Sequence, residues 1–123
     1  MKGVASPAFD RVKALGLTLP HVEAGIRYDG APVLQVDGVF LAGLATHASA
    51  EPETLVVRAD VDDREAYLED APETYYLTEY YRPYPLVLAR LTRLGDAALR
   101  DLLVGSHRLT LPKTRRKKTR VTR

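Results

Sequence analysis

Basic side chains are concentrated near the C-terminal end of this 123-residue chain. Residues 113–123 contain no acid and seven cations: Lys113, Arg115, Arg116, Lys117, Lys118, Arg120 and Arg123. Lysine and arginine displace counterions from nucleic-acid phosphates, with a salt slope of about −0.9 per contact, and such contacts read no base sequence. The segment therefore predicts salt-sensitive and mostly nonspecific nucleic-acid binding, with DNA favoured over RNA as the partner.

Two other interpretations of this basic segment stay open. It can dock on an acidic protein, which would make the chain a protein-interaction module, or it can simply keep the protein in solution. In each case its low apolar content cannot offset the entropy lost on ordering. We therefore predict that residues 113–123 form a tail that is disordered when free.

Tyrosines are the second group of residues suited to recognition. Half of residues 75–84 are tyrosines: Tyr75, Tyr76, Tyr80, Tyr81 and Tyr84. Exposed aromatic rings stack on unpaired bases, each stack contributing about 1–3 kcal/mol. On a strand, Tyr75 and Tyr76 must point to opposite sides. We expect Tyr80, Tyr81 and Arg82 to be exposed on a loop that contacts nucleic acid, although ordinary packing is the more economical interpretation of the tyrosines.

The remaining residues hold no recognisable catalytic or metal-binding pattern. The absence of cysteine excludes thiolate metal sites, disulfides and thiol catalysis. The histidines are too far apart in sequence for a helical zinc pair: His21, His47 and His107. We expect His107 in the core and His47 on a polar loop. We predict no metal, no cofactor and no enzymatic activity, and rank a small-molecule enzyme as the last alternative.

The charge is unevenly divided along the chain. The formal net charge is +2, with 18 basic and 16 acidic side chains. Without the seven cations of the basic segment, residues 1–112 keep 11 basic and 16 acidic side chains and are therefore mildly acidic. Attraction for a polyanion must come from residues 113–123. No apolar run suits a signal peptide or a membrane span, so we expect a cytoplasmic monomer that does not bind membranes.

The elements that position these residues begin with a helix and a group of strands. Pro7 at the first helical position, with Ser6 as N-cap, predicts a helix that ends before Pro20. Asp37-Gly38 predicts a type I′ hairpin between strands 33–36 and 39–42. After a polar loop at 45–53, residues 54–59 predict a third strand of an antiparallel meander. A further short strand is expected near 26–28.

The second half of the chain predicts a helix, two strands and a final helix. Asp62, followed by Glu65, resembles a capping box that opens a helix ending near Asp70. Residues 74–77 and 86–94 predict strands. Asp96 is expected to cap the last helix, which Pro112 should end. The clustering of strands predicts an α+β fold: one domain over residues 1–112 with a mostly antiparallel sheet and three helices on one side of it, followed by the disordered tail 113–123.

The chain also resembles the MmcQ/YjbR family of small bacterial proteins over about residues 8–113. The resemblance rests on these segments in order: FDRV (9–12), LPHVE (19–23), PVLQVDGVF (32–40), ETLVVR (53–58), DAPETYY (70–76), YPLVL (84–88) and LTLPK (109–113). It implies a double-wing α+β fold and DNA binding. Where the family often has lysines in the hairpin, this chain has Gln35 and Val39, and His107 replaces a frequent tryptophan.

Overall fold

The first amphipathic segment forms helix α1, Pro7–Gly16, as predicted. The computed structural model describes the backbone of residues 7–122 and the side chains of residues 7–111. The expected N-cap, Ser6, lies outside these ranges. Val12 is fully buried on the side of α1 that meets the sheet. The apolar face therefore decides how α1 is oriented.

The hairpin predicted from Asp37-Gly38 is confirmed. Strands β2, Pro32–Val36, and β3, Val39–Leu44, pair in antiparallel register on either side of it. Asp37 and Gly38 have φ angles of 50° and 83°, so both occupy the left-handed region that a type I′ turn requires. This turn gives the two strands the right-handed twist of the sheet.

The first strand of the sheet is where the prediction near 26–28 is wrong. Strand β1 is Val22–Ile26, and it pairs along its whole length with β2 at the edge of the sheet. Its sequence contains Gly25 and a charged residue, which read locally as a turn. Pairing with β2, rather than local propensity, makes this segment a strand.

Strand β4, Thr54–Arg58, is followed by helix α2, Val61–Asp70. The prediction that Asp62 caps this helix is wrong. Asp60 is the N-cap, and its side chain accepts a hydrogen bond of 2.8 Å from the backbone N–H of Asp63. Several acids stand together here, and the strand that ends just before Asp60 decides which of them meets the free N–H groups.

The last strands are shorter than predicted. Strand β5 is Tyr75–Tyr76, and strand β6 is Leu86–Arg90. The expected strand 86–94 ends early because residues Leu91–Arg93 turn into a short 3₁₀ helix. Strand β6 lies between β4 and β5 and pairs with both.

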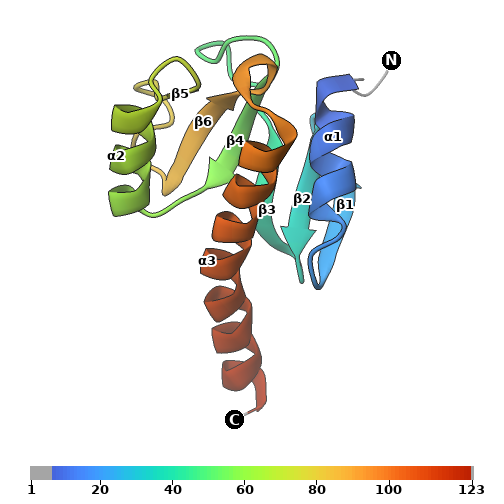
Figure 1. Ribbon diagram of the computed structural model, residues 1–123. Coiled ribbons are helices and arrows are strands. Elements are labelled where there is room, and N and C mark those ends of the chain that lie inside the picture. The colour runs from blue at the N-terminus through green and yellow to red at the C-terminus, as the bar shows by residue number, and fades with distance from the viewer. Residues whose placement is uncertain (1–6, 123) are drawn as a thin grey trace.

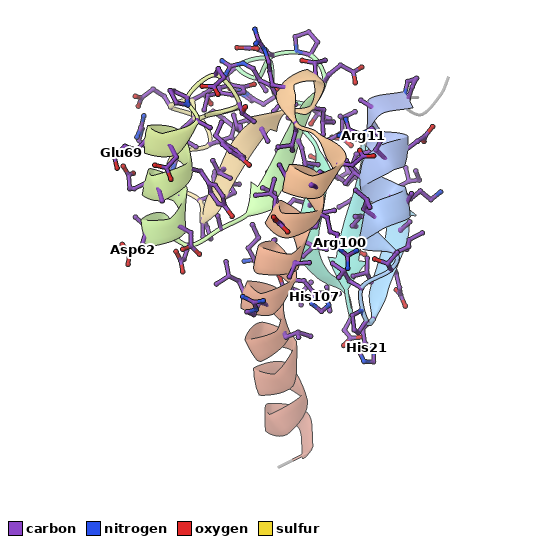
Figure 2. All side chains as sticks on the ribbon, viewed as in Figure 1. Arg11, His21, Asp62, Glu69, Arg100 and His107 are labelled. Atoms are coloured by element: carbon purple, nitrogen blue, oxygen red, sulfur yellow. The ribbon has the colours of Figure 1, made fainter. Side chains whose placement is uncertain are left out.

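A single arginine of α1 accounts for that early end. Arg11 donates to the backbone carbonyls of Leu91 (3.2 Å) and Leu94, and its Nε is 2.9 Å from Asp96 Oδ1. Figure 2 shows Arg11 between α1 and the first turn of α3. Asp96 is therefore engaged by Arg11 rather than acting as the predicted cap. The last helix begins instead with the carbonyl of Gly95, which accepts the N–H of Leu99.

Helix α3 is Asp96–Thr122, and it does not end at Pro112 as predicted. A proline in a helix lacks the donor for one i→i−4 bond and crowds the preceding turn, at a cost of about 3 kcal/mol, but it does not force the chain out of the helix. The backbone of residues 113–122 continues the helix beyond the sheet (Figure 1). The side chains from residue 112 onward, and all of Arg123, lie outside the described residues, so the division into a domain and a disordered tail stays a prediction.

These elements form one α+β domain with three helices and a six-stranded antiparallel sheet of order β1-β2-β3-β4-β6-β5. All three helices pack on one face of the sheet, called here the helix-covered face (Figure 1). Its core includes Leu34, Leu55 and Val57 from the strands and Leu99 and Leu103 from α3. The fold class predicted from the sequence is confirmed.

The opposite side of the sheet, called here the loop-covered face, is covered by loops within residues 7–122. Val56 and Leu88 project from β4 and β6 and pack beneath Tyr81. Residues from the two loop segments 45–53 and 77–85 complete this smaller cluster. Strand alternation thus divides one short sheet into two faces with different covers.

Candidate functional site

A cavity of about 450 Å³ lies on the loop-covered face. Three strands supply its apolar floor, through Phe40 of β3, Val56 of β4 and Leu86, the first residue of β6. Loops supply the rest of the lining: Arg27, Tyr28, Asp29, Thr46, His47, Tyr80, Tyr81 and Tyr84. Aromatic rings thus surround an apolar base, with a few polar groups among them.

One wall is the turn that joins β1 to β2. Its shape is set by two backbone bonds, from Arg27 N–H to the Ala31 carbonyl and from Gly30 N–H to the Arg27 carbonyl, each 2.8 Å. The carboxylate of Asp29 accepts the N–H of Ala31 (3.1 Å) and, through Oδ2, the hydroxyl of Thr46 (3.1 Å). The bond from Ala31 is the main reason that the pKa of Asp29 is below its usual value. Asp29 therefore stays an ionised acceptor at the edge of the cavity.

A second wall is the start of the polar loop 45–53. His47 Nδ1 accepts the N–H of Ser49 (3.1 Å), which leaves the proton of the neutral imidazole on Nε2. The hydroxyl of Ser49 is also 2.9 Å from that of Thr78, so this loop is bonded to the tyrosine-rich connection. The His47 ring stacks on Tyr80 with centroids 3.5 Å apart and an angle of 10° between the planes. The loop is ordered by side chains rather than by a ladder of backbone bonds.

The third wall consists of the tyrosine-rich connection between β5 and β6. Tyr80 and Tyr84 are half exposed, and their ring centroids are 6.4 Å apart. Arg82 is exposed, as predicted for it and Tyr80. The prediction that Tyr81 is exposed is wrong: only 8% of it is accessible, because it packs on Val56 and its hydroxyl accepts the His47 N–H at 3.3 Å.

The strand tyrosines point to opposite faces, as predicted. Tyr75 lies in the helix-covered core, with its ring 4.8 Å from that of Tyr67, and burial raises the pKa of both phenols. Tyr76 lies on the other face, where its hydroxyl is 2.6 Å from the Thr54 hydroxyl and accepts the N–H of Glu51 at 2.8 Å. Tyr76 therefore anchors the loop 45–53 to β4.

A buried arginine fixes the connection from the helix side. Arg64 of α2 is only 7% exposed, and its Nη1 donates to the carbonyls of Arg82 (3.1 Å), Tyr84 (2.9 Å) and Leu86 (3.4 Å). The carbonyls of Arg82 and Tyr84 belong to the irregular connection, and that of Leu86 belongs to the first residue of β6. The geometry of the cavity wall thus depends on one side chain from the helix layer.

The basic segment and the cavity are not brought together. α3 packs on the face of the sheet to which Leu55 and Val57 point, whereas the cavity floor includes Val56 between them. The candidate nucleic-acid residues consequently divide into two groups. The cations of residues 113–122 follow the backbone of α3, and Tyr80 and Arg82 belong to the opposite face.

Metal-binding clusters are not found in the part of the chain that the structure describes. There, no three histidine or acidic side chains are placed to hold a metal ion. His107 is a core histidine, as predicted, with Nε2 2.8 Å from the Pro20 carbonyl. No helix among the described residues is long and apolar enough to span a membrane.

Some residues that line the cavity were not predicted from the sequence as site residues. Tyr28, Asp29 and Phe40 belong to the β1–β2–β3 hairpins, far in sequence from the tyrosine-rich connection. The local signal in this region was the Asp29-Gly30 dipeptide. It indicates a turn, but it does not indicate that the turn lies beside the tyrosine-rich connection. No protein-family model, curated protein or solved structure matches this chain. The resemblance to the MmcQ/YjbR family therefore stays a prediction.

Proposed function

We propose that this protein is a non-enzymatic nucleic-acid-binding module, with a double-wing fold of the MmcQ/YjbR type, that holds DNA mostly nonspecifically through residues 113–123. The observation that carries the proposal is the continuation of α3 past the sheet (Figure 1). It places a stretch of backbone bearing cations, and no acids, beyond the mildly acidic remainder of the chain. Phosphate attraction is strongest where cations stand away from carboxylates.

The spacing of the cations fits a helical arrangement. Arg116, Lys117 and Arg120 stand three, four and seven residues after Lys113, and positions with these offsets follow one side of a helix. A helix fits the major groove of duplex DNA, where lysine and arginine can contact phosphates on both sides. We infer that these four positions supply most of the attraction.

Acidic groups elsewhere on the domain support the same assignment. Asp62 and Glu69 are exposed on the outer side of α2, away from the sheet (Figure 2). Carboxylates there repel phosphate, so a duplex is disfavoured along α2. The C-terminal part of α3 offers the opposite charge.

The test is a titration of duplex DNA at several salt concentrations with two matched variants of the full chain. One carries Arg116→Gln, Lys117→Gln and Arg120→Gln, and its control carries three exposed substitutions elsewhere: Lys13→Gln, Arg100→Gln and Arg108→Gln. We expect the first variant to lose roughly 3 units of salt slope, from about 0.9 per contact, whereas the control keeps the slope. Equal slopes for the two variants would overturn the proposal.

A further inference from the structure

The cavity on the loop-covered face has the size and lining of a ligand site. Its volume of about 450 Å³ lies within the roughly 300–1,000 Å³ of small-molecule sites. Tyr80 and Tyr84 are about half exposed around it, and Tyr28 is 97% exposed. A cluster of exposed aromatic rings is typical of an interaction or ligand site. Three such rings around one apolar floor therefore point to a flat partner with an aromatic surface.

Polar groups at the edge of the cavity define what else that partner carries. Asp29 is ionised and only accepts hydrogen bonds, and each of its oxygens has a lone pair beyond those used by Ala31 and Thr46. Arg27 and His47 Nε2 offer donors. Arg27 Nη2 is 3.9 Å from Asp29 Oδ2. Among the described residues, His47 Nε2 has no hydrogen-bond partner. The partner must therefore present both donors and acceptors near its ring.

Other ligand classes use only part of this lining. An aliphatic chain would leave Asp29 and Arg27 without partners, and inorganic phosphate would leave the rings uncovered. A quaternary ammonium group suits an aromatic cage beside a carboxylate, but the guanidinium of Arg27 would repel it. A nucleobase has a flat aromatic surface, amino donors and ring acceptors, and it is commonly attached to a phosphate that Arg27 can meet.

We propose that this cavity binds one nucleobase of a nucleotide, by stacking on the exposed tyrosine rings with Asp29 accepting from the base and Arg27 near the phosphate. The site is built in advance, because Thr46 bonds Asp29, Ser49 bonds Thr78, and Arg64 holds the connection that carries Tyr84. A prepared site loses little entropy on binding. The inference does not need the basic segment, because the cavity and α3 lie on opposite faces of the sheet.

The test is calorimetric titration of the full chain with adenosine monophosphate, and with ribose 5-phosphate as the probe that lacks a base. Tyr84→Ala removes a ring whose backbone bonds, from its N–H to Tyr81 and from Arg64 to its carbonyl, stay in place. We expect it to weaken nucleotide binding about fivefold or more. Tyr84→Phe should stay within about twofold of the unchanged protein, because it keeps the ring. Leu17→Ala, at a half-exposed residue outside the cavity lining, is the matched control and should not change affinity.

A second substitution separates base recognition from stacking alone. Asp29→Asn keeps an oxygen for the Ala31 N–H but loses the charge. We expect a severalfold weaker affinity for adenosine monophosphate and no change for ribose 5-phosphate. If ribose 5-phosphate binds with the same affinity as a nucleotide that itself binds, or if Tyr84→Ala leaves the affinity of the bound nucleotide or oligonucleotide unchanged, the proposal is wrong.

A second ligand, single-stranded oligodeoxyadenylate, distinguishes a base within a nucleic-acid strand from the base of a free nucleotide. The protein used is the triple variant at Arg116, Lys117 and Arg120. Binding of the oligonucleotide alone, weakened by Tyr84→Ala, identifies an unpaired base in a strand, and binding of the mononucleotide identifies a free nucleotide. Binding of neither overturns the base site. The proposed duplex binding by α3 is tested separately through its salt slope, so the two can fail independently.

Discussion

The two faces of the sheet are closed by different means. On the helix-covered face, apolar side chains of the strands meet apolar stripes of three helices, whose backbone groups are already bonded within each helix. On the loop-covered face, irregular segments lie over Val56 and Leu88, and their polar backbone groups need partners from side chains such as Tyr76, Tyr81 and Arg64. The helix-covered face therefore supplies most of the buried apolar core, whereas the loop-covered face leaves aromatic rings and charged groups exposed to solvent.

The largest expected effect compares one leucine from each face. Leu55 points to the helix-covered face and Leu88 to the other, and both are fully buried. Leu55→Ala should lower the free energy of unfolding by about 4 kcal/mol, and Leu88→Ala by about 2 kcal/mol, because loops can collapse into a cavity more readily than packed helices can. Urea unfolding measures both. Equal losses would mean that the loops are packed as rigidly as the helices.

The next effect concerns the side chain that joins the two faces. Arg64→Met keeps the apolar stem but removes the donor for three carbonyls, so we expect a loss of about 2 kcal/mol. The amide protons of Tyr84 and Leu86 should also exchange faster with solvent. Arg100→Met, on the exposed side of α3, is the control and should change neither quantity. A gain in stability would instead show that the desolvation penalty of the buried guanidinium exceeds the free energy of its hydrogen bonds.

A smaller effect distinguishes the two neighbouring strand tyrosines. Tyr76→Phe removes the hydroxyl that meets Thr54 and Glu51, and it should cost about 1 kcal/mol. Tyr75→Phe should be close to neutral, because for the Tyr75 hydroxyl we find no hydrogen-bond partner among the described residues. Thermal unfolding of the two variants side by side checks this. Equal shifts in Tm would contradict the assignment that the Tyr76 hydroxyl stabilises the fold and the Tyr75 hydroxyl does not.

The smallest expected effect is a pH dependence on the loop-covered face. Arg90 donates to both carboxylate oxygens of Glu51, at 2.9 and 2.8 Å, and these bonds lower the pKa of Glu51 from its ordinary 4.5. The folded protein thus binds this proton less readily than the unfolded chain does. The contribution to stability is present above pH 4.5 and is lost as the pH falls through the lowered value. Glu51→Gln should reduce the stability difference between pH 7 and pH 3, measured by urea unfolding, and an unchanged difference would contradict the assignment.

Local sequence signals predicted turns and helix starts correctly where the conformational preference of one or two residues sets the backbone dihedral angles. Asp37-Gly38 predicted a turn of the observed type, and Pro7 predicted the start of helix α1. The same signals were wrong where a side chain from a distant part of the sequence bonds the residue in question. Asp96 was expected to cap α3, but Arg11 engages it from another helix.

The candidate sites divide in the same way. Tyr80 and Arg82 were expected on an exposed loop and are found there, but Tyr81 beside them is buried beneath that loop. Tyrosine alone does not reveal exposure, because its ring suits a core and its hydroxyl suits a surface. Only the strand beneath the loop, through Val56, decides which ring is covered.

Composition and local pattern by themselves determined the α+β class, the central hairpin and the separation of a basic segment from a mildly acidic remainder. These follow from backbone preferences and charge, which act over a few neighbouring residues. Tertiary structure alone decided that β1 spans residues 22–26 rather than 26–28, that the 3₁₀ turn ends β6, and that Tyr28, Asp29 and Tyr84 surround one cavity. Such features depend on which strands become neighbours, and the free energy of pairing and packing is shared among residues far apart in the chain.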